Sequence, residues 1–269
     1  MRIGLVAKHD VPERVEVARE VVKLLNGRAE VIVKDELAAH FPDLKAQALR
    51  DMQVDVLATV GGDGTILYAM QQSSAPVFGI NTGELGFLTE VEPANLREAL
   101  DKLLRKEYTV EDRLKLAVRV NGERTPDAVN EAVIKSAHPS KMLALRVASN
   151  GELIEDIRAD GVILATPTGS TSYSMSAGGP IVDPRIEAFI MVPLAAFKLG
   201  ARPFVFPARA KVEVALPPEA KDAVLVADGQ FERRLAGGDQ VDFTGAQQRA
   251  RFLRFSTHFY GRLRERLVR

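Results

Sequence analysis

The chain has 269 residues, of which 46% are hydrophobic and 27% charged, proportions typical of a soluble globular protein with one large domain or two small ones. Its 36 basic side chains balance its 36 acidic ones, so no overall field attracts it to nucleic acid or an anionic membrane, and we expect a small ligand. The absence of cysteine excludes disulfides, thiolate catalysis and cysteine-ligated zinc.

The four histidines are scattered, without the paired spacing of a transition-metal site. The N-terminus becomes charged at Lys8 before an apolar signal segment develops. The longest apolar run, residues 188–197, contains Pro193 and is too short to span a bilayer. We therefore expect a cytoplasmic protein that binds neither nucleic acid nor membrane.

Predicted strands and helices alternate along residues 1–108. Strands are expected at 3–7, 30–33, 54–60 and 77–80, and helices at 12–25, 66–70 and 93–106. This alternation predicts an N-terminal α/β domain with a doubly wound, largely parallel sheet.

A glycine turn, Gly-Gly-Asp-Gly-Thr at residues 61–65, joins the strand at 54–60 to the helix that follows. Such a turn lies at the carboxyl end of a strand, where glycines let backbone N–H groups approach phosphate oxygens at a helix N-terminus. Asp63 would repel a phosphate unless a metal ion or a reacting hydroxyl lay beside it, so it is our first candidate catalytic residue. The alternative is a tight turn in which Asp63 only caps the helix.

A second glycine-rich turn, at residues 81–87, follows the strand at 77–80. Two such turns in consecutive strand–helix units predict one crevice at the carboxyl edge of the sheet.

From residue 109 the hydrophobic pattern changes to a period of two. Strands are expected at 114–120, 128–134, 143–148, 161–165, 211–215, 224–227 and 240–243. Turn signals such as Asn121-Gly122 and Asn150-Gly151 separate several of them. Residues 109–250 are therefore expected to form an all-β, sandwich-like domain.

The final segment, residues 251–269, carries Phe255, Phe259, Leu263 and Leu267 at steps of four, which predicts a terminal helix that packs on another surface. Arginines lie among them at 262, 264, 266 and 269. We interpret these arginines as a solvated face rather than a phosphate site.

Residues 160–180 form an unusual passage. Its predicted strand runs into a turn in which hydroxyls and glycines are crowded around a single aromatic residue, Tyr173. Hydroxyls and free N–H groups suit phosphate or ribose oxygens, and an aromatic ring suits a base. The alternative is a Ser/Gly linker, which rarely embeds Thr-Pro-Thr between apolar strands. Asn130 and Glu131 lie next to each other in a predicted strand, so their side chains are expected on opposite faces unless a bulge intervenes.

These passages together resemble the NAD kinase family, which phosphorylates the adenosine-ribose 2′-hydroxyl of NAD. The resemblance runs over nearly the whole length and rests on residues 61–65, 81–87, 130–131 and 160–180 in the family's order. It implies an N-terminal α/β domain, a C-terminal β domain that binds NAD, a chain end that packs back on the first domain, and a homodimer or homotetramer.

The resemblance also implies the site residues. Asp63 acts on the 2′-hydroxyl, and Asn130 with Glu131 holds the adenosine portion. The remaining binding residues that it implies are Gly61, Gly62, Gly64, Thr65, Phe87, Arg158, Asp160, Thr168, Thr171, Ser172, Tyr173 and Ser176. Parts of the dinucleotide pocket are expected to come from a neighbouring subunit.

Two stretches differ from the family pattern or have an open role. A proline–histidine pair is expected near residue 193, but residues 193–199 contain no histidine, so no role of that residue carries over. Residues 228–230 keep an Asp-Gly-Gln, for which the plain interpretation is a hairpin turn.

Phosphoryl transfer requires mainly positioning and charge neutralisation from a protein. We expect Mg²⁺ to enter with ATP, with no metal ligands assigned in the chain, and Asp63 to orient the hydroxyl and accept its proton late. The sequence does not distinguish ATP from polyphosphate as donor. The alternatives are a lipid kinase of the diacylglycerol or sphingosine type, which shares the glycine turn but not residues 166–173, and an inactive dinucleotide-binding regulator.

Overall fold

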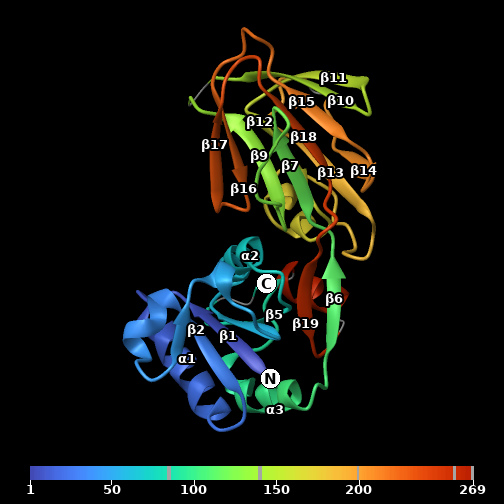
Figure 1. Cartoon of the computed structure of the whole chain (residues 1–269). Helices are drawn as coiled ribbons and strands as arrows, with labels where there is room; N and C mark the ends of the chain where they lie inside the picture. The colour runs from blue at the N-terminus through green and yellow to red at the C-terminus, as the bar shows by residue number, and fades with distance from the viewer. Residues whose placement is uncertain (84–85, 139–140, 199, 257–258, 268–269) are drawn as a thin grey trace. The chain divides into compact units, whose positions relative to one another are not determined.

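The structure, a computed structural model, describes residues 1–83, 86–138, 141–198, 200–256 and 259–267. Glu84 and Leu85 of the predicted second turn, and Leu199, lie outside the described residues. The chain divides into two compact units, which we call unit 1 (Met1–Asp112 with Ala250–Arg269) and unit 2 (Arg113–Arg249) (Figure 1).

Unit 1 contains a seven-stranded sheet in the order β3-β2-β1-β4-β5-β19-β6. Its strands are β1 (Arg2–Ala7), β2 (Glu30–Lys34), β3 (Lys45–Gln47), β4 (Val56–Val60), β5 (Val77–Ile80), β6 (Thr109–Arg113) and β19 (Ala250–Arg254). Its helices are α1 (Pro12–Leu25), α2 (Asp63–Gln72), α3 (Leu96–Leu104) and α5 (Phe259–Leu267), with short 3₁₀ turns η1 (Asp35–His40), η2 (Leu49–Asp51) and η3 (Pro93–Asn95).

The pairs from β3 to β5 are all parallel, and helices cover both faces of this sheet. Ile3, Leu5 and other residues of one strand face share a buried cluster with the apolar sides of α1 and α3. On the other face, Gly79 leaves room for Ile66 of α2, because a Cβ there would lie 2.6 Å from the Ile66 Cδ1 atom. The doubly wound arrangement predicted from the sequence is therefore confirmed.

The last strand of the chain, β19, joins the sheet of unit 1 between β5 and β6 (Figure 1). It runs parallel to β5, with Phe252 opposite Val77. The hydrophobic pattern did not predict β19 or β6, although it predicted the terminal helix that follows as α5. Because of β19, the chain end belongs to the α/β unit.

Unit 2 consists of two six-stranded sheets, ordered β11-β10-β15-β18-β7-β8 and β14-β13-β12-β9-β16-β17. Its strands are β7 (Leu116–Val120), β8 (Glu123–Arg124), β9 (Glu131–Ser136), β10 (Leu143–Ser149), β11 (Glu152–Ala159), β12 (Gly161–Ala165), β13 (Ala188–Leu194), β14 (Phe204–Pro207), β15 (Val212–Ala215), β16 (Ala223–Ala227), β17 (Phe231–Leu235) and β18 (Gln240–Gly245). The turn η4 (Gly169–Thr171) and the short helix α4 (Tyr173–Ser176) follow β12.

All paired strands of unit 2 are antiparallel, and alternate residues point into a core that both sheets share. Val162 and Leu164 of β12 enter this core with Phe243 from the other sheet, whereas Ile163 and Ala165 join a second cluster under Val182. The sandwich prediction is confirmed, and the passage after β12 covers the outer face of its sheet.

Within the described part of the chain, no helix has the length and apolar character needed to cross a bilayer.

Candidate active site

The glycine turn of unit 1 connects the buried strand β4 to helix α2, as the sequence predicts. The N–H of Gly61 donates to the carbonyl of Ile80 at 2.9 Å, which ties the turn to β5, and the N–H of Thr65 donates to Gly62 at 3.0 Å. Gly61 has φ of 153°, and a Cβ there would collide with the Thr65 hydroxyl. The turn therefore holds the helix N-terminus, with its unpaired N–H groups, at the carboxyl end of a central strand.

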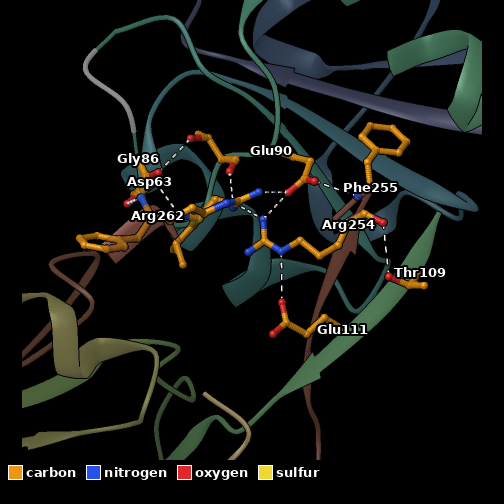
Figure 2. Close-up of polar contacts among 11 residues, drawn as sticks. Asp63, Gly86, Glu90, Thr109, Glu111, Arg254, Phe255 and Arg262 are labelled. Atoms are coloured by element: carbon orange, nitrogen blue, oxygen red, sulfur yellow. Dashed lines mark hydrogen bonds and ion pairs between the residues drawn. The ribbon is translucent and has the colours of Figure 1, made fainter. Parts of the chain in front are cut away.

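Asp63 is the first residue of α2, and the cap position belongs to Gly62. Its carboxylate does not cap the helix. It accepts the N–H of Phe87 on Oδ2 at 2.8 Å and the N–H of Leu88 on Oδ1 at 3.0 Å (Figure 2). These two bonds fix the plane of a partly exposed carboxylate, and each oxygen keeps a lone pair for a further donor.

Gly86 makes this geometry possible, because a Cβ at that position would overlap the Oδ1 atom of Asp63. Thr89 also donates its hydroxyl to the Gly86 carbonyl at 3.4 Å. The second glycine-rich turn, with Leu88 directly after it, therefore holds the Asp63 carboxylate in place through backbone N–H groups. The sequence predicted only that this turn lines the same crevice as the first one.

Three buried side-chain oxygens toward the carboxyl ends of β4 and β5 have no hydrogen-bond partner among the described residues: Thr59 Oγ1 in β4, and Asn81 Oδ1 and Thr82 Oγ1 just after β5. A buried polar atom without a partner costs about 1–3 kcal/mol. The carboxyl edge of this sheet therefore has unused capacity for a polar ligand.

In unit 2, the Asn130–Glu131 pair is anchored by a residue almost one hundred positions away. The carboxylate of Asp228 accepts the N–H groups of Val129, Asn130 and Glu131 at 2.7, 2.8 and 3.1 Å. Asn130 precedes β9, so strand alternation does not apply to it, and both side chains of the pair are buried. The prediction that the two side chains point to opposite faces assumed that both residues lie in a strand, but β9 begins only at Glu131.

Asp228 and Gly229 both have positive φ, 51° and 65°, as the central residues of a tight turn closed by the Gln230 N–H on Ala227 at 2.9 Å. The hairpin interpretation of residues 228–230 is therefore correct, and the same turn presents a buried carboxylate to Asn130 and Glu131. The signal was present in the sequence as Asp-Gly after an apolar strand, but nothing local showed which backbone it binds.

The carboxyl groups of Glu131 and Asp228 share a buried environment. Burial, together with the nearby charge of Asp228, raises the pKa of Glu131 from 4.5 to about 7, and a hydrogen bond from Ser172 opposes that rise. Burial also raises the pKa of Asp228, against three backbone donors and the ammonium of Lys115. Glu131 therefore changes charge near neutral pH.

Several hydroxyl groups of the passage after β12 form hydrogen bonds to the backbone of the passage itself or of the neighbouring segment. Thr166 Oγ1 donates to the Val129 carbonyl at 2.6 Å and accepts the Gly169 N–H at 3.1 Å. Ser170 donates to Pro167 at 2.7 Å, and Thr171 donates to Thr168 at 3.3 Å. These donors are spent on backbone carbonyls, so the passage is a constructed turn rather than a linker.

Other buried polar atoms of this region have no hydrogen-bond partner within the part of the chain that the structure describes. They are Asn130 Oδ1, Glu131 Oε2, Thr168 Oγ1 and Ser174 Oγ, all buried. Gly169 packs against the Asn130 backbone, where a Cβ would overlap the carbonyl oxygen, so the two segments that carry these atoms are in direct contact. Tyr173 and Ser176 on α4 are exposed beside them. Carbonyl, carboxylate and hydroxyl oxygens together fit a ligand that offers N–H and O–H donors.

Arg158 and Asp160 lie at the other end of β12. The β9–β12 register places Ala165 opposite Glu131 but Gly161 opposite Lys135. Five strand residues, roughly 16 Å, therefore separate Asp160 from the passage that begins at Thr166. Arg158 lies instead over the ring of Phe197, 5.7 Å from its centroid, and its carbonyl accepts the Phe197 N–H. Within one chain, these two residues do not join the other site residues of unit 2.

We expect Glu131→Gln to flatten the pH dependence of stability. A carboxyl whose pKa is raised on folding stabilises the fold fully below pH 4.5, and this contribution is lost as pH rises through about 7. The rise from 4.5 to about 7 corresponds to roughly 3 kcal/mol in the free energy of unfolding.

Urea unfolding at several values between pH 4.5 and 8 measures this difference, with the exposed Glu152→Gln as the control. If wild type and Glu131→Gln lose stability in parallel over that range, Glu131 is not the group that titrates.

Two family models match the chain. The model described as ATP-NAD kinase N-terminal domain matches residues 3–108, and the one described as ATP-NAD kinase C-terminal domain matches residues 129–255. The chain is 46% identical to the NAD kinase of Methanothermobacter thermautotrophicus, over 100% of this chain and 96% of that protein. It is 40% identical to the NAD kinase of Thermococcus sibiricus, over 97% and 96% respectively.

The solved structures that are similar to this fold include two NAD(H) kinases with bound ligands. An NAD kinase from Archaeoglobus fulgidus in complex with ATP has a TM-score of 0.79 and 33% identity, over 97% of this chain and 96% of that one. The yeast NADH kinase complexed with NADH has a TM-score of 0.92, covering 100% of this chain and 87% of that one. At 24% identity, the yeast structure supports the fold alone.

Proposed function

The chain belongs to the NAD kinase family, and from this premise we propose how its own residues carry out the reaction. It is a phosphotransferase with an alcohol acceptor, which transfers the γ-phosphoryl group of ATP to the adenosine-ribose 2′-hydroxyl of NAD and gives NADP and ADP. The matches run over the whole length, so neither a lipid kinase nor an inactive regulator describes the chain.

Asp63 is the proposed catalytic residue, and the observation that carries this proposal is its double hydrogen bond to Phe87 and Leu88. A carboxylate fixed in this way presents a lone pair in a constant direction, so it orients a hydroxyl with little loss of entropy. The hydroxyl proton passes to Asp63 late, as the bond from the 2′-oxygen to the γ-phosphorus forms and the bond from that phosphorus to the β-phosphate oxygen of the departing ADP breaks.

Glu131 and Asn130 are proposed to hold the adenosine half. Both present unpartnered buried acceptor oxygens, and adenosine offers ribose hydroxyls and a base amino group as donors. Thr168, Thr171 and Ser172 line the same part of unit 2, and the exposed ring of Tyr173 is suited to stacking on a base. Asp228 keeps the backbone of this acceptor pair in place.

The donor phosphates are assigned to the glycine turn. The N–H groups at the start of α2, beside Gly62 and Gly64, suit phosphate oxygens, and Thr65 closes the first helical turn behind them. A magnesium ion that enters with ATP would be held mainly by phosphates and waters, and we assign it no ligand in the chain. When bound, that ion neutralises charge on the phosphates.

We expect a strict requirement for a divalent cation. Removal of metal with EDTA should lower NADP formation at least about 100-fold, because the triphosphate charge is then not neutralised, and Mg²⁺ in excess should restore it. A coupled assay of NADP formation from NAD, with ATP or polyphosphate in separate arms, measures metal dependence and donor together. Full turnover in EDTA would contradict the proposed role of the metal.

We propose a homodimer or homotetramer located in the cytoplasm, where ATP and NAD are available. Support comes from Arg158 and Asp160, which lie at the opposite end of β12 from the other pocket residues. If all of them contact dinucleotide, two subunits contribute to one pocket. The edge strand β14, with Val205 56% exposed, offers a surface for such pairing.

Dilution should therefore lower specific activity, and NAD should oppose the loss, because a ligand of the assembled form stabilises it by mass action. Light scattering coupled to activity at falling protein concentration measures both. A fully active monomer would remove the shared pocket from the proposal.

A further inference from the structure

Two arginines from the end of the chain meet one buried carboxylate in unit 1. Arg254 in β19 donates to Glu90 at 2.9 Å, and Arg262 in α5 donates to the same Glu90 oxygen at 2.6 Å (Figure 2). The side chains of Glu90 and Arg254 are only 2% and 3% exposed. The second Glu90 oxygen accepts the N–H of Phe255 at 2.8 Å, and Arg254 Nε donates to Glu111 at 3.1 Å.

The same arginines also bind the backbone that holds Asp63. Arg254 Nη1 donates to the carbonyl of Leu88 at 3.0 Å, and Arg262 Nη1 donates to the carbonyl of Thr89 at 3.0 Å. Leu88 therefore donates its N–H to Asp63 and accepts from Arg254 through its carbonyl. We call residues 87–90 the strip. Its N–H groups donate hydrogen bonds to Asp63, and its carbonyl groups accept hydrogen bonds from the two arginines.

This strip has no regular secondary structure, so these side chains supply much of what fixes it. Hydrogen bonds from a charged group to a buried partner are stronger than those between neutral groups. Both terminal nitrogens of Arg262 are occupied, by Thr89 and by Glu90. The sequence-based assignment of Arg262 to a solvated face is therefore wrong, and its contacts leave a phosphate role without support.

We propose that Arg262 and Arg254 are positioning residues for Asp63, so that the chain end sets the orientation of the catalytic carboxylate. The inference rests on the proposed role of Asp63. Loss of Arg262 removes the bond to the Thr89 carbonyl and one of the two arginine bonds to Glu90. Arg254 then holds the carbonyl side of residues 87–90 alone, and the N–H donors of Phe87 and Leu88 sample more orientations. Because transfer depends on the direction of the Asp63 lone pair, turnover falls while substrate binding is kept.

The test is Arg262→Met, with Arg264→Met as the control on the same helix, since Arg264 is exposed. Arg262→Met leaves Glu90 paired with Arg254 and Phe255, so no buried charge is left alone. We expect kcat to fall about 10-fold or more, with KM for NAD and ATP within about 2-fold. NAD-binding stoichiometry from titration calorimetry corrects for any inactive fraction.

Local hydrogen exchange is the second measurement. Peptides that cover residues 86–90 should exchange faster in Arg262→Met than in wild type or Arg264→Met, whereas the strands of unit 1 keep their protection. Arg262→Lys should recover part of kcat, because an ammonium restores one of the two bonds. A kcat within 2-fold of wild type, or a lower kcat with unchanged exchange at 86–90, overturns the inference.

Asp63→Asn is assayed beside these variants to separate the two claims. If Asp63→Asn stays active, the proposed function of Asp63 fails, whatever Arg262→Met does. If Asp63→Asn is inactive and Arg262→Met is normal, only the positioning role fails.

Discussion

Asp63→Asn is expected to lower kcat for NADP formation by at least about 100-fold while NAD affinity stays within a few fold. The substitution keeps the volume of the side chain and removes the charge that orients the hydroxyl and accepts its proton. It also turns one acceptor oxygen into an NH₂ group that faces the N–H of Phe87 or Leu88, so the seat of the side chain is disturbed as well.

Isothermal titration of NAD beside the kinase assay separates binding from turnover. Asp43→Asn, an exposed aspartate in the same unit, is the matched control and should behave as wild type. Near-normal turnover of Asp63→Asn would contradict the catalytic role of Asp63. Loss of NAD binding in the same variant would show instead that the damage is structural.

Asp228→Ala is expected to have the second largest effect, on stability and on NAD binding together. It leaves the N–H groups of Val129, Asn130 and Glu131 without their acceptor in a buried site, and removes one of the two carboxylates, with that of Asp127, whose charge acts on Lys115. Removal of one member of such a buried set typically costs about 3–5 kcal/mol. Because the freed segment carries Asn130 and Glu131, KM for NAD should rise far more than KM for ATP.

Urea unfolding followed by circular dichroism measures the stability, and steady-state kinetics measures the two KM values. Asp222→Ala, just before the same strand and 69% exposed at the side chain, is the control. Lowered stability with an unchanged KM for NAD would show that Asp228 serves only the fold. A change in the free energy of unfolding below about 1 kcal/mol would contradict the anchoring role altogether.

Local pattern was enough to predict the strands and turns on which the proposed catalytic residue depends. The apolar run at 54–60 ends in the observed strand β4 at Val60, and the run at 161–165 coincides with β12. In both cases a continuous apolar stretch is followed by glycine or hydroxyl residues, so sequence and structure agree at the level of single elements.

What the sequence did not show are bonds between distant segments. Asp63 lies 24 positions from the Phe87 N–H, and Asp228 lies 98 from the Asn130 N–H. Their partners follow from strand order, which periodicity does not contain. Polar edge strands were missed for another reason: β17 reads Phe-Glu-Arg-Arg-Leu and has too few apolar residues to be recognised.

Because β19 and α5 complete a sheet that begins at Arg2, unit 1 is discontinuous in the chain, whereas unit 2 is continuous. A ribosome therefore releases all of unit 2 before it releases the residues that pair with β5 and with Glu90. Contacts such as that between Glu90 and Arg262 span 172 positions, and contacts of this separation form late. Unit 2 is expected to fold during synthesis. Residues 87–90, which hold the Asp63 carboxylate, are expected to become ordered only after residue 262 has emerged. The order needed for catalysis is therefore expected to follow the folding of the β sandwich, because it depends on contacts of residues 254 and 262 that lie after unit 2 in the chain.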